Sequence, residues 1–240
     1  MTVALARRLS AELLGCALLA AIVIGSGIAA QRLSPGDVGL QLLENAIATA
    51  LGLPVLILVF GQVSGAHFNP VVSLVDSASG LRSWADTALY IPVQIVGCIG
   101  GAILANLMFG DPAVTFSTTD RLTPPHFLAE VVATAGLILV VFALARTKRA
   151  NLTPAAVGAY IGAAYFFTSS SSFANPAITV GRMFSDTFAG IAPGSVPGFI
   201  AAQLLGAAVG LLLVRWFHPP RAVQGPGQDG HRPRRAAEPL

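Results

Sequence analysis

Two asparagine–proline pairs are the residues whose types and spacing point most directly to a chemical role. They are the boxes Asn69-Pro70-Val71 and Asn175-Pro176-Ala177. Asparagine is a favoured helix N-cap and proline is favoured at the first helical position, so each box predicts the start of a helix. Each helix is short, because about ten residues at about 1.5 Å each give about 15 Å, half of a hydrocarbon core about 30 Å thick. We expect two half-helices that enter a membrane from opposite faces and meet near its midplane.

The asparagine amides indicate what such a meeting point would do. As an N-cap, the side-chain oxygen of Asn69 or Asn175 accepts a hydrogen bond from the backbone N–H two or three residues on, which fixes the amide orientation. The NH₂ group then points into a lumen as a donor, and each helix N-terminus carries the equivalent of about half a positive charge. Two facing ends disfavour protons and cations, whereas neutral polar solutes still accept hydrogen bonds. The alternative is that both residues merely cap buried helices, which the paired context disfavours.

Composition identifies the elements that position the boxes as membrane helices. Of the 240 residues, 54% are hydrophobic and 10% are charged, and the mean hydropathy is +0.73; these values lie outside the range of soluble globular domains. Six apolar segments of about 20 residues are found at 9–30, 38–61, 84–109, 126–145, 154–170 and 197–217. We predict one all-α membrane domain over residues 9–217, between a cytoplasmic N-terminus (1–8) and a disordered cytoplasmic tail (218–240).

An internal repeat relates two halves, at about residues 9–109 and 126–217. An Ala-Glu pair lies near the start of each half, and each half ends on a helix with the pattern Gln-x-x-Gly-x-x-x-Gly. These residues are Ala11-Glu12 and Ala129-Glu130, then Gln94, Gly97 and Gly101, and Gln203, Gly206 and Gly210. An odd number of spans in each half inverts one repeat relative to the other, so broken helices meet between the repeats. The paired glycines let neighbouring helices approach closely.

The basic residues predict the orientation in the membrane. If the N-terminus is cytoplasmic, eleven Lys and Arg residues lie inside, and only Arg32, Arg121 and Arg182 lie outside. Because basic residues concentrate on the cytoplasmic side, both termini are predicted to be inside. The basic pI then reflects topology and attraction to anionic lipid, and gives no case for nucleic acid as a partner.

Several polar or reactive residues within this apolar chain need an explanation. Glu12 and Glu130 lie in spans, where an acid either forms a proton relay or accepts hydrogen bonds from the exposed backbone of a re-entrant loop. His67 precedes the first box and either braces its loop or lines and gates the approach to the pore. Cys16 and Cys98 lie in separate spans and are expected to be small packing residues. We predict neither a metal site nor a cofactor.

The two boxes, together with the run Ser64-Gly65-Ala66-His67, resemble the paired Asn-Pro-Ala boxes of the aquaporin and aquaglyceroporin (major intrinsic protein) family. The resemblance covers about residues 9–217. It implies six transmembrane helices with two re-entrant half-helices, a homotetramer with one pore in each subunit, and a bracing role for Glu12 and Glu130. Val71 replaces the usual alanine of the first box, a change expected to affect packing more than chemistry.

A second departure from the family concerns the narrow outer filter. In most relatives the residue directly after the second box is an arginine, whereas this chain has Ile178. Spacing from the boxes places the rest of the filter at Thr49, Ala163 and Ser172. All four residues are smaller or uncharged, so the resemblance implies a wide, weakly polar constriction that is not strictly water-selective. Aromatic side chains nearby that would narrow it again are Phe166, Phe167 and Phe173.

Arg182 is the nearest substitute charge, four residues past Ile178 and therefore on the same helix face about one turn nearer the outer mouth. One hypothesis is that it lines the vestibule and attracts anionic or strongly dipolar solutes. The alternative is an ion pair with Asp186, four residues further on, or contact with lipid headgroups.

The run from Ser169 to Pro193, without a filter arginine, looks like a bacterial subgroup of the family associated with arsenic resistance. That resemblance implies a passive channel in the inner membrane for water, glycerol and metalloid hydroxides such as arsenous acid. A water-selective channel and a secondary transporter of the same plan are alternatives. An enzyme is not expected, because Ser169 to Ser172 have no histidine nearby in sequence.

Overall fold

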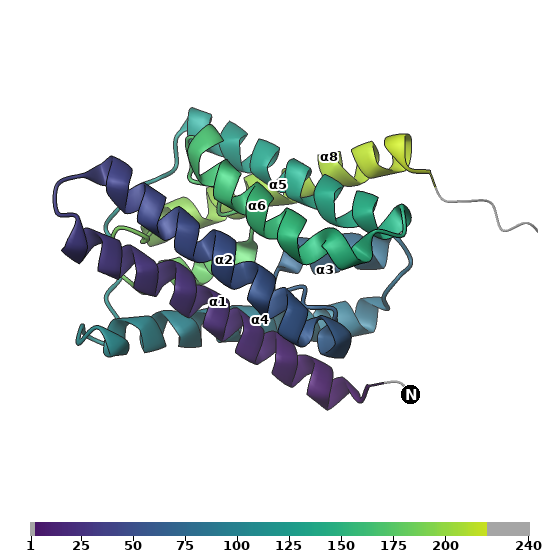
Figure 1. Ribbon diagram of the computed structural model, residues 1–240, viewed down its shortest axis with the longest axis horizontal. Helices are drawn as coiled ribbons and strands as arrows, with labels where there is room; N and C mark the ends of the chain where they lie inside the picture. Colours follow the sequence, from purple (N-terminus) through teal and green to yellow (C-terminus); the bar gives the residue numbers. More distant parts are fainter. Residues whose placement is uncertain (1–2, 220–240) are drawn as a thin grey trace, which may run out of the picture.

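A computed structural model describes residues 3–219, and within that range every regular element is helical (Figure 1). The first half contains α1 (Leu5–Leu33), α2 (Val38–Ser64), α3 (Pro70–Ala78) and α4 (Trp84–Met108). The second contains α5 (Pro124–Arg146), η1 (Ala150–Leu152), α6 (Thr153–Phe167), α7 (Pro176–Arg182), η2 (Pro193–Ser195) and α8 (Val196–Phe217). The two halves thus repeat a pattern of two long helices, one short helix and one long helix, as the sequence predicts.

The predicted spans correspond to α1, α2, α4, α5, α6 and α8. Five helices in the described range are long and apolar enough to cross a membrane. The exception is α6, which has 15 residues and ends at Phe167, not at the predicted residue 170. Its length of about 22 Å is less than a full hydrocarbon core, because the polar residues from Thr168 onward form the loop that leads to the second box. Residues 220–240 of the predicted tail lie outside the described range.

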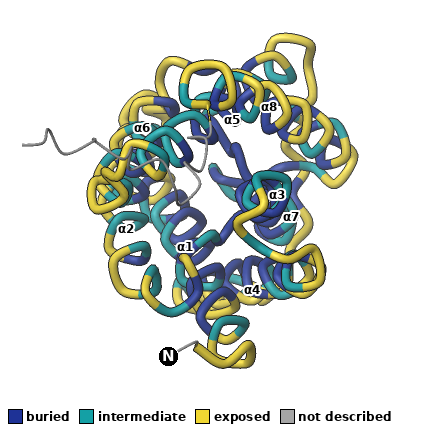
Figure 2. Tube along the Cα trace, turned by 90° about the vertical axis from the view of Figure 1, so that its right-hand side faces the viewer, coloured by how far each residue is buried: buried dark blue, intermediate teal, exposed yellow. Residues whose placement is uncertain are grey.

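The long helices surround the two half-helices, as the view along the bundle shows (Figure 2). Within the halves, α1 packs on α2 and α4, and the corresponding α5 packs on α6 and α8. Between the halves, α2 packs on α6, and each half-helix contacts the last helix of the other half: α3 contacts α8, and α7 contacts α4. These reciprocal contacts are those of an inverted repeat.

The glycines of the repeated Gln-x-x-Gly-x-x-x-Gly pattern are required at the tightest of these crossings. A Cβ atom on Gly101 would lie 2.0 Å from the Ala17 carbonyl oxygen, and one on Gly206 would lie 2.5 Å from that of Val131. No side chain fits there, so α4 approaches α1, and α8 approaches α5, at backbone contact distance. The free thiols of Cys16 and Cys98 are buried in the α1–α4 contact.

Candidate functional site

Each box forms the helix cap that its sequence predicts. Asn69 has an extended backbone, and its Oδ1 accepts a hydrogen bond from Val71 N at 3.1 Å. Asn175 is also extended, and its Oδ1 accepts from Ala177 N at 2.9 Å and from Ile178 N at 3.3 Å. The side-chain oxygen of each asparagine is therefore committed to its own helix, and only the NH₂ group is available for other partners.

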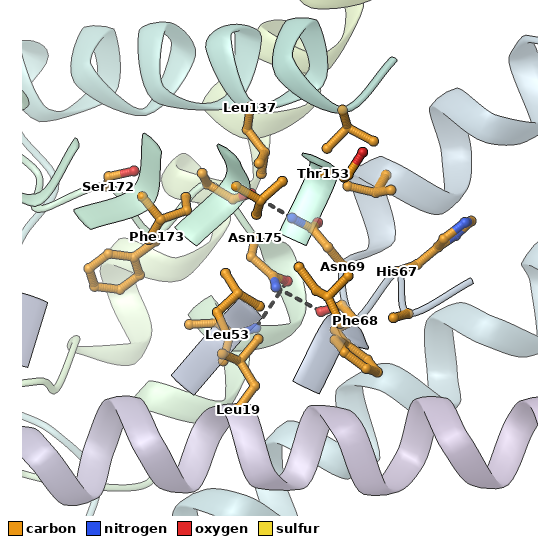
Figure 3. Close-up of a pocket in the computed structure, with 18 of the residues that line it drawn as sticks. Leu19, Leu53, His67, Phe68, Asn69, Leu137, Thr153, Ser172, Phe173 and Asn175 are labelled. Carbon is orange, nitrogen blue, oxygen red and sulfur yellow. Dashed lines mark hydrogen bonds between the residues drawn. The ribbon is translucent and has the colours of Figure 1, made fainter. Parts of the chain in front are cut away.

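The two caps meet and hold each other (Figure 3). Asn69 Nδ2 donates to the Ala174 carbonyl at 2.8 Å, and Asn175 Nδ2 donates to the Phe68 carbonyl at 2.8 Å. Each amide thus binds the carbonyl of the residue that precedes the other asparagine. Because an amide NH₂ has two N–H donors, one donor on each asparagine is left for the lumen that both residues line.

Glu12 and Glu130 brace the two re-entrant loops with equivalent hydrogen bonds. Glu12 accepts from Ser64 Oγ at 2.6 Å, the backbone N–H groups of His67 and Phe68 at 3.0 and 2.8 Å, and Gln94 Nε2 at 2.8 Å. The four corresponding donors to Glu130 are Ser170 Oγ at 2.6 Å, Phe173 N at 2.8 Å, Ala174 N at 2.9 Å and Gln203 Nε2 at 2.7 Å. Both carboxylates are fully buried. This geometry favours the bracing role over the proton relay, because the donors are backbone N–H groups of the loops and serine and glutamine side chains that hold those loops in place.

The loops need this bracing because their backbone is strained. Ala66 and Phe68 in the first loop have φ values of +48° and +49°. Ser172 and Ala174, at the equivalent positions of the second loop, have φ values of +50° and +47°. Non-glycine residues seldom adopt this left-handed region, and it persists only where the surroundings hold it. The carboxylates supply that restraint at both boxes.

A cavity of about 200 Å³ runs past both asparagines. We call its two ends the Asp76 end, where Asp76, Leu81 and Thr153 line it, and the Arg182 end, where Ser172, Phe173 and Arg182 line it. In Figure 3, Ser172 and Phe173 lie on one side of the asparagines, and His67 and Thr153 lie on the other. Between them the walls are mostly apolar, with Leu19, Leu53, Val72, Leu137 and Ile178 among the lining residues.

His67 lines the cavity and is held on three sides. Its Nδ1 lies 3.0 Å from Ser73 Oγ, and its Nε2 lies 3.3 Å from Arg82 Nη2 and 3.5 Å from Asp76 Oδ2. His67 therefore both contacts the residues that hold the first loop and lines the cavity.

Three of the four predicted filter residues line the cavity, and one prediction is wrong. Thr49, Ser172 and Ile178 are lining residues, but Ala163 is exposed on the outer surface of α6. Tyr165 lines the cavity from this helix, and its hydroxyl lies 3.1 Å from Thr49 Oγ1. Counting back from the second box assumed a fixed loop length, whereas the loop after Phe167 determines which face of α6 turns inward. No local signal in the sequence distinguishes Tyr165 from its neighbours.

The structure also decides between the alternatives for the nearby aromatic and charged residues. Phe173 lines the cavity, whereas Phe166 and Phe167 are about half exposed on the outside of α6 and do not narrow it. Arg182 lines the cavity and forms no ion pair with Asp186, whose Oδ1 accepts instead from Thr118 N at 2.9 Å. The position of Arg182 at its end of the lumen agrees with the vestibule hypothesis.

The family model and the individual relatives that match this chain point to the same protein family. The family model for major intrinsic proteins matches residues 1–174. The chain is 48% identical over 216 residues to aquaglyceroporin AqpS of Rhizobium meliloti, covering 90% of this chain and 92% of the relative. It is 30% identical over 254 residues to human Aquaporin-10, covering 90% of this chain and 83% of that protein.

A solved structure supports the fold independently. The X-ray structure of the aquaglyceroporin from Plasmodium falciparum is similar with a TM-score of 0.67 at 20% sequence identity, covering 88% of this chain and 96% of that one. This likeness concerns the fold alone. The sequence matches, together with the pair of opposed Asn-Pro boxes, show that this chain belongs to the major intrinsic protein family, an integral membrane family of passive solute channels.

Proposed function

We propose that this chain is a passive channel for small uncharged solutes, namely water, glycerol and metalloid hydroxides such as arsenous acid, and not an enzyme. The observation that carries the proposal is the cavity past both asparagine caps. Its wall offers an amide donor from Asn69 and from Asn175 and is otherwise mostly apolar. A neutral polar solute exchanges water for these donors, whereas a cation meets two positive helix ends.

The filter residues support solutes larger than water. Ile178 stands where most relatives have an arginine, and the small polar residues Thr49 and Ser172 line the same cavity. Arsenous acid is a small uncharged trihydroxide, so it presents the same hydrogen-bonding groups as a polyol. Tyr165 adds an aromatic hydroxyl to this set, a group that can donate a hydrogen bond to a polyol or accept one from it.

We place the channel in the inner membrane with both termini cytoplasmic, so that the Asp76 end faces the cytoplasm and the Arg182 end faces outward. The basic residues predict this orientation. A homotetramer is proposed from the family, and the exposed leucines Leu51, Leu58 and Leu212 would lie against lipid or a neighbouring subunit. Residues 9–217 are the proposed channel domain, in which His67 lines and braces the cytoplasmic approach.

The test is reconstitution into liposomes, with osmotic flux compared for water, glycerol, urea and arsenous acid. We expect all four to pass without saturation and without coupling to a proton gradient. Water passing far better than the other three would instead support the water-selective alternative. Saturable, proton-coupled uptake would support a transporter.

Replacing Asn175 by aspartate tests the observation itself. Aspartate also caps helices, but Asn175→Asp loses the N–H donor and the bond to the Phe68 carbonyl. We expect glycerol flux to fall about fivefold, the equivalent of about 1 kcal/mol for one hydrogen bond. Asn151→Asp, at an exposed site in η1, is the matched control and should keep wild-type flux. Equal glycerol flux in the two variants would show that the Asn175 amide does not contribute to conduction.

A further inference from the structure

We propose that Arg182 is the fixed cation of the filter, supplied from the last turn of α7 in place of the residue after the box, and that with Ser172 and Tyr165 it forms a hydrogen-bonding site for uncharged polyhydroxy solutes. The inference rests on the proposed channel function and deepens it. It assigns cation exclusion at the Arg182 end to a side chain seven residues beyond Asn175.

The guanidinium of Arg182 is held in one orientation at the lumen wall. The residue lines the cavity although only 2% of its surface is exposed. Its Nε donates to the Ala189 carbonyl, and its Cζ lies 3.5 Å from the centroid of the Phe173 ring. Stacking on a ring face and one backbone hydrogen bond fix the plane of the guanidinium. Its terminal nitrogens form no hydrogen bond within the described residues, so these donors are available to a solute.

Arg182 forms no ion pair with a carboxylate of the described residues. Within residues 3–219, no carboxylate oxygen lies within 4 Å of it. A second arginine stands beside it: Arg121 Cζ lies 5.7 Å from the centroid of the same Phe173 ring, and its side chain donates to the Phe188 and Gly190 carbonyls at 2.8 and 2.6 Å. Two guanidinium groups therefore share one ring and three consecutive carbonyls, those of residues 188–190.

An unpaired buried charge is costly, and in a membrane protein it indicates a functional position. Here the arrangement keeps positive charge at one end of the lumen, where it repels cations and offers donors to oxygen atoms. Ile178 leaves the preceding turn of α7 without charge, so the positive potential at this end comes from Arg182, with Arg121 behind it.

The neighbouring hydroxyls complete a site for a solute that carries several hydroxyl groups. Ser172 is 3% exposed, lines the cavity, and its Oγ has no hydrogen-bond partner in the described structure. The Tyr165 hydroxyl lies 3.1 Å from Thr49 Oγ1, and both residues line the cavity. A guanidinium donates to a solute oxygen, while serine and tyrosine hydroxyls both donate and accept. This combination matches a neutral polyol better than a solute with a single polar group.

The experiment compares Arg182→Gln with Arg32→Gln in the same liposomes. Arg32 is a matched control, because it lies at the same end of the molecule, is paired with Asp111 at 2.7 Å and does not line the cavity. Glycerol and water permeability are measured by light scattering, and cation leak is measured with an entrapped dye under an imposed potential. We expect Arg182→Gln to raise cation leak about tenfold or more, equivalent to about 1.4 kcal/mol of lost barrier, and to lower the ratio of glycerol to water permeability. Arg32→Gln should change neither.

Two further variants make the result decisive. Arg182→Lys keeps the charge but loses the stacked plane, so it should retain cation exclusion and still lower the glycerol-to-water ratio. Ile178→Arg in the Arg182→Gln background should restore cation exclusion from one turn away.

The proposal is overturned if Arg182→Gln conducts glycerol and excludes cations as Arg32→Gln does. If Arg182→Gln is not recovered as a monodisperse protein, a wild-type glycerol-to-water ratio in Arg182→Lys overturns it. Failure of the proposed function is distinct, because the wild type itself would then pass no glycerol.

Discussion

The two half-helices place opposite charges at equivalent positions. Asp76 is the seventh residue after Asn69, Arg182 is the seventh after Asn175, and both line the cavity. Asp76 is neutralised, because its Oδ2 lies 3.1 Å from Arg82 Nε. Arg182 stacks on the Phe173 ring and forms no ion pair with a carboxylate of residues 3–219. An inverted repeat thus produces a lumen whose ends differ in charge, although the helices that carry those charges are equivalent.

The comparison extends to the ring that precedes each box by two residues. His67 in the first loop packs near Tyr90 and Arg82, and Phe173 in the second packs under Arg182. The bracing is nevertheless the same on both sides: a buried glutamate, a serine, two backbone N–H groups and a glutamine. The repeat therefore keeps the residues that hold the loops and the two asparagine caps, and it varies the residues at the two ends of the lumen.

The largest expected effect tests the equivalence of the two braces. Glu12→Ala and Glu130→Ala each leave four donors without their acceptor, two of them backbone N–H groups in a strained loop. We expect each variant to lose about 3 kcal/mol or more of stability, seen as a fall of roughly 10 °C in the midpoint of thermal unfolding in detergent. Glu44→Ala, which removes the acceptor of Ser34 Oγ alone, should cost far less. A large loss in only one of the two brace variants would contradict their equivalence.

An intermediate effect is expected when the Asp76 end loses its neutrality. Arg82→Gln leaves the Asp76 carboxylate without its partner and makes that end of the lumen negative. Cation leak into liposomes should rise about threefold, less than for Arg182→Gln because the barrier at the other end remains. The double variant Asp76→Asn with Arg82→Gln should return the leak toward the wild-type value. A double variant that leaks as much as the single one would show that charge at this end is not the cause.

The smallest effect sharpens the assignment of the filter. Tyr165→Phe removes the hydroxyl that lies 3.1 Å from Thr49 Oγ1, and the lower end of what one neutral hydrogen bond contributes is about 0.6 kcal/mol. We expect the ratio of glycerol to water permeability to fall about threefold at most. Tyr160→Phe is the control on the same helix, since its hydroxyl donates to the Ala133 carbonyl at 3.1 Å and does not line the cavity. Identical ratios in both variants would remove Tyr165 from the filter.

The sequence by itself determined the architecture and its centre. Hydropathy predicted the long spans, the Asn-Pro pairs predicted both half-helices with their caps, and the repeated glycines predicted that neighbouring helices approach closely. These features depend on residues near one another in the chain, such as a cap and the N–H two residues on, or on composition averaged over a span. These features can therefore be predicted without knowing which residues pack against them.

Only the tertiary structure decided which side chains face one another across the lumen. Tyr165 faces the cavity and Ala163 faces outward on the same helix. The fold also places the Arg182 guanidinium on the Phe173 ring and beside Arg121, and Arg182 forms no ion pair with Asp186. The pairing of Asp76 with Arg82 likewise depends on how the chain turns after α3. A shift of one or two residues in a loop rotates a helix face, and such a rotation changes charge partners without altering any local pattern in the sequence.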